Sequence, residues 1–323
     1  MRSPQIDKLF VSVIVPTHGR AVLLRRLLHS LLAQNWPADC FEIIIVDNLA
    51  DHDTDRVVSS IAATTMISIS HHRVTSGSPG SSRQFGAEQA RGSVLAFIDD
   101  DCEATPNWIA AGTSALSQGY GLVQGRTLPH PAQRRHLLDK TVSVTGPTPF
   151  FETCNIFYNA AIFNKVGGFP VAFRERFYSE DVALGWTIRR AGYQVGFTET
   201  AVVYHEVFLV SLTGWLLEPR KMRHWPFLAR AFPELRRELF LRVFLTPLTA
   251  AFDLFVVGLA AALILNPIWV VLTLPYVGVR FLIPGRFRAP HLRLARFVFG
   301  IPRAAVLAMT LVINSFRARA LVI

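Results

Sequence analysis

The stretch Val94–Glu103, VLAFIDDDCE, decides the fold of this chain. An apolar run leads directly into three consecutive aspartates, Asp99, Asp100 and Asp101. The run is too short for a helix of its own and predicts a buried strand of a parallel sheet. The three carboxylates then lie at the carboxyl end of that strand, which is the edge where open α/β sheets bind their ligands.

Adjacent carboxylates repel one another, and a divalent cation relieves the repulsion. Mg²⁺ or Mn²⁺ suits such oxygen ligands and keeps coordination positions open for substrate phosphates. A solvated acidic turn or helix start is the alternative, because Pro106 and Asn107 follow closely. On an extended chain Asp99 and Asp101 would face one side and Asp100 would point away.

Charge and hydrophobic content divide the chain into two parts. Residues 1–210 contain 18 basic and 19 acidic residues, whereas residues 211–323 contain 15 and 4. Hydrophobic residues make up 51% of the chain, which is high for an ordinary soluble enzyme. Because the basic surplus flanks the long apolar runs, it indicates a membrane surface as partner and no nucleic acid.

Three widely spaced cysteines, an odd number, show no metal or redox spacing and suit a reducing compartment. The short apolar run near the N-terminus ends at Pro16 and predicts a first strand, not a signal peptide.

Strand and helix patterns alternate along the first hundred residues. This βαβ succession predicts an α/β fold with a mostly parallel central sheet. Strands are expected at 10–15, 42–46, 66–70 and 94–98, with helices at 22–32, 54–63 and 82–89. Further on, the pattern predicts helices at 108–116 and 180–191, strands at 194–197 and 201–204, and an irregular connection at 133–148.

Six motifs, taken in order, resemble the inverting nucleotide-sugar glycosyltransferases of family 2, which have the GT-A fold. The resemblance covers about Val11 to His205. Its motifs are VSVIVPTHGR, FEIIIVDN, SGSPGSSRQFGAEQARG, FIDDD, NKVGGF with SEDVALGWTIRRAGY, and VVYHEV. Each motif alone is weak, but their shared order and spacing make the resemblance specific.

The resemblance implies a donor site and a metal site. The residues that would bind the nucleotide-sugar are Pro16, Thr17, Arg20, Asp47, Arg83 and Asp99, and those that would hold Mn²⁺ or Mg²⁺ are Asp101, Asp99 and His205. Asp101 is the expected direct ligand. Three alternatives stay open: Asp47 could close an Asx turn with Asn48, Arg83 could be a solvated helix arginine, and His205 could be structural.

The pair Glu180-Asp181 opens a predicted helix, where acidic residues are common for helix reasons alone. In the family the aspartate of this pair is the base that deprotonates the acceptor hydroxyl. The resemblance therefore gives Asp181 the role of catalytic base and makes Glu180 its acceptor-binding neighbour. A hydroxyl is a poor nucleophile, so a positioned carboxylate is chemically sensible.

This chain departs from the family pattern at several positions. Asn48-Leu49-Ala50 replaces the usual acidic-Gly-Ser turn, Pro170 follows Phe169 in place of an aspartate, and Thr187 stands where arginine is frequent. The segment RKMRHW at 220–225 has His224 between the arginine and the tryptophan that processive synthases keep adjacent. We therefore expect a non-processive enzyme, with this segment either an active-site lid or a basic helix at the membrane surface.

The C-terminal part predicts membrane association. We expect a glycosyltransferase domain over residues 1–210, a basic interfacial segment over 211–242 and membrane-associated helices over 243–323. Asn266-Pro267 divides a hairpin at 243–283, and arginines on both sides of 297–316 favour a re-entrant or in-plane helix there. A buried helical core of a soluble protein is the alternative.

Together these features predict a transferase at the cell membrane whose catalytic domain faces the cytoplasm. It would move a sugar from a nucleotide diphosphate to a hydroxyl of a lipid-linked or glycan acceptor. A polyprenyl-phosphate sugar synthase and a non-catalytic nucleotide-sugar-binding subunit remain as alternatives.

Overall fold

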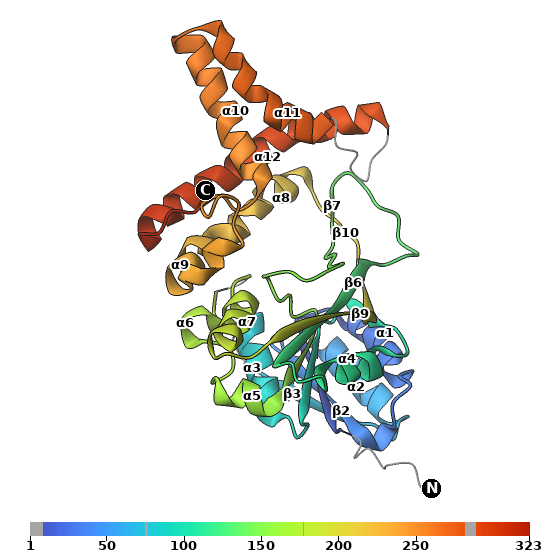
Figure 1. The fold of residues 1–323 in the computed structure, drawn as a ribbon. Helices are drawn as coiled ribbons and strands as arrows, with labels where there is room; N and C mark the ends of the chain where they lie inside the picture. Colours follow the sequence, from blue (N-terminus) through green and yellow to red (C-terminus); the bar gives the residue numbers. More distant parts are fainter. Residues whose placement is uncertain (1–8, 75–76, 177, 282–288) are drawn as a thin grey trace, which may run out of the picture. The chain divides into compact units, whose positions relative to one another are not determined.

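The computed structural model describes residues 9–74, 77–176, 178–281 and 289–323. The chain forms two compact units. The sheet unit comprises the residues up to 134 together with 141–207, and the helical unit comprises 135–140 and 208–323. Figure 1 shows the elements of both units, which are described separately below.

An eight-stranded sheet is the centre of the sheet unit, with the order β3-β2-β1-β4-β8-β6-β9-β5. The strands β3, β2, β1 and β4 are parallel to one another, whereas β8 runs antiparallel to both of its neighbours. The first four have the bounds Val11–Thr17 (β1), Phe41–Asp47 (β2), Ser68–Arg73 (β3) and Val94–Ile98 (β4). The other four are Cys102–Ala104 (β5), Leu122–Pro129 (β6), Asn155–Asn159 (β8) and Val195–His205 (β9). The predicted α/β class with a mostly parallel sheet is confirmed.

Alternation of side chains sends apolar residues to both faces of the sheet, which explains why its central strands are continuously hydrophobic. One face packs in a common core with α1 (Ala21–Leu32), α2 (His52–Ala62) and α4 (Trp108–Leu116). The other face carries α3 (Pro79–Gln89), where Gly86 lies directly on Ile14 and Val46. A cluster of aromatic rings completes that second face, made of Phe97, Tyr158, Phe163 and Phe169.

One strand prediction is corrected. The two strands expected at 194–197 and 201–204 are a single strand, β9, which pairs with β6 and shifts register between Gly125 and Arg126. The shift breaks the alternation of side chains that sequence patterns rely on. The end of β9 then pairs with β5, which places His205 opposite Cys102.

Helices lie between β8 and β9 in the chain: α5 (Ala160–Lys165), α6 (Val171–Arg174) and α7 (Glu180–Arg190). Gly80, near the start of α3, lies so close to this group that a Cβ there would be 2.5 Å from the carbonyl oxygen of Arg174 and 3.0 Å from Cγ of Glu180. The close approach brings the first turn of α3 against the first turn of α7.

The helical unit begins with β7 (Asp139–Lys140) paired to β10 (Phe208–Leu209). Short helices follow: α8 (Leu212–Leu217), η2 (Glu218–His224), α9 (Trp225–Ala231) and η3 (Pro233–Arg237). The apolar helix α10 (Pro247–Ile264) then turns at Asn266, whose side chain caps η4 (Pro267–Thr273) before α11 (Leu274–Phe281). Figure 1 shows α10 and α11 folded back against each other as a hairpin.

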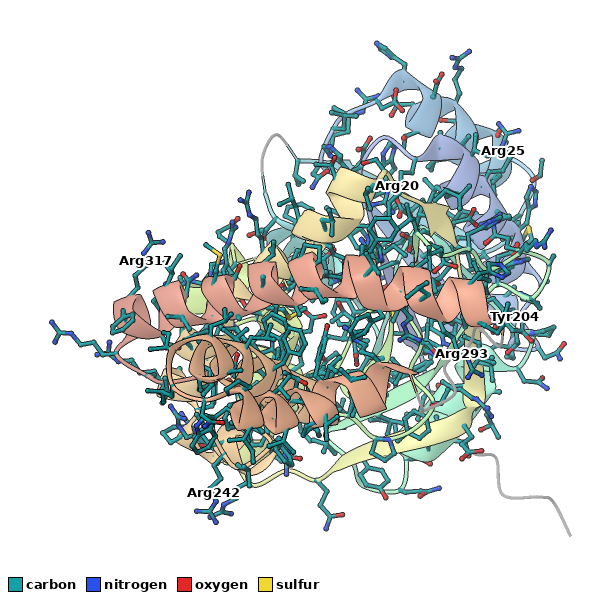
Figure 2. The ribbon with its side chains drawn as sticks, turned by 90° about the horizontal axis from the view of Figure 1, so that it is seen from above. Arg20, Arg25, Tyr204, Arg242, Arg293 and Arg317 are labelled. Carbon is teal, nitrogen blue, oxygen red and sulfur yellow. The ribbon has the colours of Figure 1, made fainter. Side chains whose placement is uncertain are left out.

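The last helix, α12 (Pro290–Ala318), is longer than the run expected at 297–316. By length and composition, α10 and α12 are the helices of the described residues that could cross a membrane. Yet Arg303, in the middle of α12, donates to Glu218 at 2.6 Å and lies over the ring of Trp215 at 4.5 Å. Figure 2 shows Arg293 near one end of α12 and Arg317 near the other.

Candidate active site

The three aspartates lie on a tight turn between β4 and β5, at the carboxyl end of the parallel strands. The backbone N–H of Cys102 donates to the carbonyl of Asp99 at 3.1 Å, which closes the turn. The expectation that Asp100 points away from its neighbours is therefore wrong, because it assumed an extended chain. Asp100 and Asp101 share a partner, whereas Asp99 faces another element.

The loop after β1 supplies the partner of Asp100 and Asp101. Nη1 of Arg20 lies 2.6 Å from Oδ2 of Asp101 and 3.2 Å from Oδ1 of Asp100. The hydroxyl of Thr17 donates to Oδ2 of Asp100 at 2.7 Å. Burial raises the pKa of Asp100 to about 7, although the charge of Arg20 opposes that shift. The aspartate turn thus contacts two of the residues predicted to bind the donor, Thr17 and Arg20, and a third, Pro16, directly precedes Thr17 in the chain.

A group suited to a metal ion lies beside this turn. Ligand atoms of Asp101, Cys102 and His205, all buried, lie within 4.8 Å of one another. The pairing of β5 with β9 creates the group, because it sets His205 opposite Cys102. The backbone N–H of Glu206 also donates to the carbonyl of Asp101 at 2.9 Å and fixes the two segments together.

The hydrogen bonds of His205 favour the tautomer that binds metal. Its Nδ1 lies 2.8 Å from the carbonyl oxygen of Glu206, so Nδ1 carries the proton in that bond. Nε2 lies 3.4 Å from Oδ1 of Asp101. A backbone carbonyl that holds one ring nitrogen is the usual support of a histidine that binds metal through the other.

Cys102 was not among the predicted metal residues, and the chemistry of its thiol makes it a weaker candidate ligand than Asp101 or His205. Burial raises the pKa of its thiol well above the ordinary value, which disfavours the thiolate. Mn²⁺ and Mg²⁺ also prefer oxygen or imidazole to sulfur. The residues that fit such an ion are therefore Asp101 and His205.

Arg83 joins the aspartate turn to the start of α7. It is buried, and its Nη2 lies 2.6 Å from Oδ1 of Asp99 while its Nη1 lies 3.4 Å from Oε1 of Glu180. Burial lowers the pKa of the guanidinium, but the carboxylates of Asp99, Asp181 and Glu180 outweigh burial and raise it. Arg83 is therefore a charged, buried bridge, which excludes the alternative of a solvated helix arginine.

The acidic pair at the start of α7 is held by separate contacts. Oε2 of Glu180 accepts from the backbone N–H of Ser179 at 2.9 Å. Oδ2 of Asp181 accepts from both the N–H and the hydroxyl of Thr153, each at 3.2 Å. Burial and the charge of Asp181 raise the pKa of Glu180 to about 8, although Arg83 opposes the shift. Burial also raises the pKa of Asp181, against the effects of Arg83 and of Thr153.

Asp47 closes an Asx turn, which is the alternative that the sequence left open for this residue. It is fully buried at the end of β2, where Oδ1 accepts from the N–H of Leu49 at 2.9 Å and Oδ2 from the N–H of Asp51 at 3.2 Å. The Asx turn therefore occupies both oxygens. Asn48 is more exposed than Asp47, and its side chain contacts His18 at 2.5 Å and the carbonyl of Gly77 at 3.2 Å.

Sequence reasoning missed the neighbours of the acidic pair. Thr153 and Glu152 lie in the irregular segment before β8, and Tyr158 lies within that strand. Glu152 accepts from Gln124 at 2.6 Å and from Thr148 at 3.0 Å, and burial raises its pKa. The motif FETCNIF gives no periodicity that would reveal these contacts.

Comparisons with known proteins find a family model and sequence relatives. A family model described as glycosyl transferase family 2 matches residues 12–178. The glycosyltransferase AglE of Haloferax volcanii is 28% identical over 208 residues, which are 61% of this chain and 66% of that protein. GalNAc(5)-diNAcBac-PP-undecaprenol beta-1,3-glucosyltransferase of Campylobacter jejuni is 31% identical over 119 residues, 36% of this chain and 38% of that one. The chain spans less than two thirds of the length of the curated relatives it matches.

Solved structures share the fold. The mannosyltransferase PcManGT from Pyrobaculum calidifontis, in complex with GDP-Man and Mn²⁺, matches with a TM-score of 0.61 at 17% identity, covering 97% of this chain and 88% of that chain. TarS 1-349 of S. aureus in complex with UDP-GlcNAc matches with a TM-score of 0.51 at 17% identity, covering 97% and 93%. At these identities the likeness concerns the fold.

Proposed function

This chain belongs to glycosyl transferase family 2, and we propose that it transfers a sugar from a nucleotide diphosphate to an acceptor hydroxyl with inversion, assisted by a divalent cation. The observation that carries the proposal is the pairing of two sites through Arg83. Asp101 and His205 are suited to the cation beside the diphosphate, and Asp99 connects through Arg83 to the acidic pair Glu180-Asp181.

The chemistry assigns one task to each group. Mn²⁺ or Mg²⁺, bound by Asp101 and His205, would neutralise charge on the leaving nucleotide diphosphate. The oxygen of the acceptor hydroxyl forms a bond to the anomeric carbon as the bond from that carbon to the phosphate oxygen breaks. Asp181 takes the proton of the hydroxyl, and the bonding electron pair leaves with the diphosphate. Arg20 and Arg83 add fixed positive charge near the leaving group.

The remaining predicted residues have supporting roles in this proposal. Pro16 and Thr17 shape the donor loop beside Arg20, and Asp99 orients Arg83. Asp47 shapes the turn that would hold the nucleobase of the donor, since the backbone N–H groups of that turn donate to its carboxylate.

A lipid-linked or glycan acceptor at the membrane is the proposed substrate. A relative in C. jejuni bears a name that specifies an undecaprenol-linked acceptor, which supports this class.

A cluster of charged side chains in the helical unit also supports such an acceptor. Arg303 and Lys221 both lie against Glu218, at 2.6 and 3.9 Å. Burial and the neighbouring Lys140 lower the pKa of Lys221 to about 8. Such a cluster suits the phosphates of a lipid-linked acceptor.

A panel of nucleotide-sugars tests the proposal directly. The full chain, purified in detergent, is incubated with each donor and Mn²⁺, and the released nucleotide is measured with and without a chelator. We expect release with one donor or a narrow set, and loss of release with the chelator. Binding of a nucleotide-sugar without turnover would favour a non-catalytic subunit instead.

A polyprenyl-phosphate sugar synthase is the second candidate, favoured by the same cluster of cations in the helical unit. Its acceptor is a phosphate, which needs no general base. Asp181→Asn distinguishes the two, because the proposed reaction should fall roughly a hundredfold or more while donor affinity persists. Full activity of that variant on a polyprenyl phosphate would favour the synthase.

A further inference from the structure

The side chain of Asp181 is held asymmetrically. Oδ2 accepts two hydrogen bonds, from the backbone N–H and from the hydroxyl of Thr153. Oδ1 is buried and has no hydrogen-bond partner among the residues that the structure describes. Thr153 itself is 1% exposed, so it cannot exchange these bonds for water without a movement of the chain.

The segment that carries Thr153 is fixed on α7 at two more points. The ring of Phe151 packs on Gly185 so closely that a Cβ there would lie 2.0 Å from Cδ2 of the ring. The indole of Trp186 donates to the carbonyl of Pro149 at 3.1 Å. Phe151 also has a φ of +54°, a left-handed conformation that non-glycine residues adopt only where their surroundings impose it.

We propose that Thr153 is a positioning residue for the base, which holds Oδ2 of Asp181 so that Oδ1 faces the acceptor hydroxyl. This inference rests on the proposed function for its catalytic meaning. The two hydrogen bonds also favour the ionised form of the carboxylate, which is the form that accepts a proton. Thr153 touches neither donor nor metal in this assignment.

The charged groups around Asp181 influence its pKa and must be considered when a Thr153 variant is titrated. The charged and titratable groups that act on it come from every neighbouring element: Arg83 of α3, Asp99 after β4, Glu152 before β8, Tyr158 of β8 and Glu180 of α7. None of them changes in a Thr153 variant. A shift in the pKa of Asp181 in such a variant therefore reports the lost hydroxyl.

The test compares Thr153→Val, which removes the hydroxyl and keeps the shape and the backbone N–H, with Thr153→Ser, which retains the hydroxyl. Thr113→Val is the matched control, because Thr113 is also buried but its hydroxyl has no partner among the described residues. For each variant, kcat and KM are measured against pH with the donor found in the panel. The ¹³C shift of the Asp181 carboxyl, assigned with Asp181→Asn, is titrated in parallel.

We expect Thr153→Val to lower kcat roughly tenfold, to leave KM for the donor unchanged and to move the acidic limb of the pH profile upward by about half a unit or more. Thr153→Ser and Thr113→Val should resemble the parent. In the Asp181→Asn background, Thr153→Val should not lower kcat any further, because the two residues act as one unit.

Two results would overturn the inference: an unchanged carboxyl titration in Thr153→Val, or a further loss of activity when that change is added to Asp181→Asn. The carboxyl titration needs no turnover. If no donor reacts but the titration shifts, the proposed function fails while the contact holds. If transfer proceeds and the titration does not shift, only the inference fails.

Discussion

Each of the three consecutive aspartates has its own set of partners, and this difference is the main feature at the scale of residues. Asp99 pairs with Arg83, Asp100 with Thr17 and Arg20, and Asp101 with Arg20 and His205. Sequence spacing predicted that these carboxylates lie at a sheet edge. It could not predict their directions, because a turn of two residues replaces the extended geometry that a spacing argument assumes.

The first prediction at this scale concerns the carboxylate of Asp101, which is proposed to bind the metal. Asp101→Asn should abolish most transfer and most Mn²⁺ binding while the fold survives, because an amide is a weaker ligand of the same shape. Calorimetric titration with Mn²⁺ and thermal melting measure the two effects. Asp53→Asn, on the exposed face of α2, is the control. Wild-type Mn²⁺ affinity in Asp101→Asn would contradict the assignment.

Glu180 gives a pH-dependent prediction. Its pKa is about 8 in the folded chain against an ordinary 4.5, so the folded state binds the proton more tightly than the unfolded state. The stability that this difference contributes is present below pH 4.5 and is lost as the pH rises through 8. Glutamine does not titrate. Thermal melting should therefore show Glu180→Gln gaining Tm relative to the parent as the pH is raised across that interval, and a constant difference would disagree.

At the scale of elements, the sequence predicted regular segments well and long-range pairings poorly. The strand Val94–Ile98 and the helix Trp108–Leu116 have the expected bounds, because their apolar runs end at sharp polar signals. The contact between Thr153 and Asp181 joins an irregular segment to a helix 28 residues away. No local pattern encodes such a pairing, since tertiary packing of Phe151 on Gly185 creates it.

That packing leads to a prediction about α7. An alanine in a helix interior is normally about 1 kcal/mol more stable than glycine, but Gly185→Ala should be destabilising because its Cβ overlaps the Phe151 ring. We expect a lower Tm together with a lower kcat. Gly278→Ala in α11 is the control, since no described atom lies within 4 Å of its added Cβ. A Gly185→Ala variant as stable and as active as the parent would disprove the role of this contact.

At the scale of the whole molecule, the chain forms two compact units, and charge and hydrophobicity differ between residues 1–210 and 211–323. The sequence predicts that the C-terminal part associates with a membrane, because its long apolar runs are flanked by arginines, and this stays a proposal. It could not predict that Arg303 contacts Glu218 and Trp215. This half-buried ion pair in the middle of α12 favours the proposal that the helix lies in the membrane plane, since an arginine at the centre of a crossing helix is costly.

Labelling in intact cells tests the membrane arrangement. In a Cys40→Ser background, a cysteine at Asn266 should react with an impermeant thiol reagent, and one at Arg293 should resist it. The expectation follows from the bias of arginines toward the cytoplasmic side and from the turn between α10 and η4. Reaction at Arg293 without reaction at Asn266 would reverse the proposed orientation.

Metal-dependent transfer with inversion is tested most directly by the anomeric configuration of the first product. With the donor identified in the panel and Mn²⁺ present, ¹H NMR follows the anomeric proton from the start of the reaction. We expect an α-linked donor to yield a β-linked product and a chelator to stop its formation. A product of retained configuration, or transfer that continues in excess chelator, would contradict metal-dependent inversion.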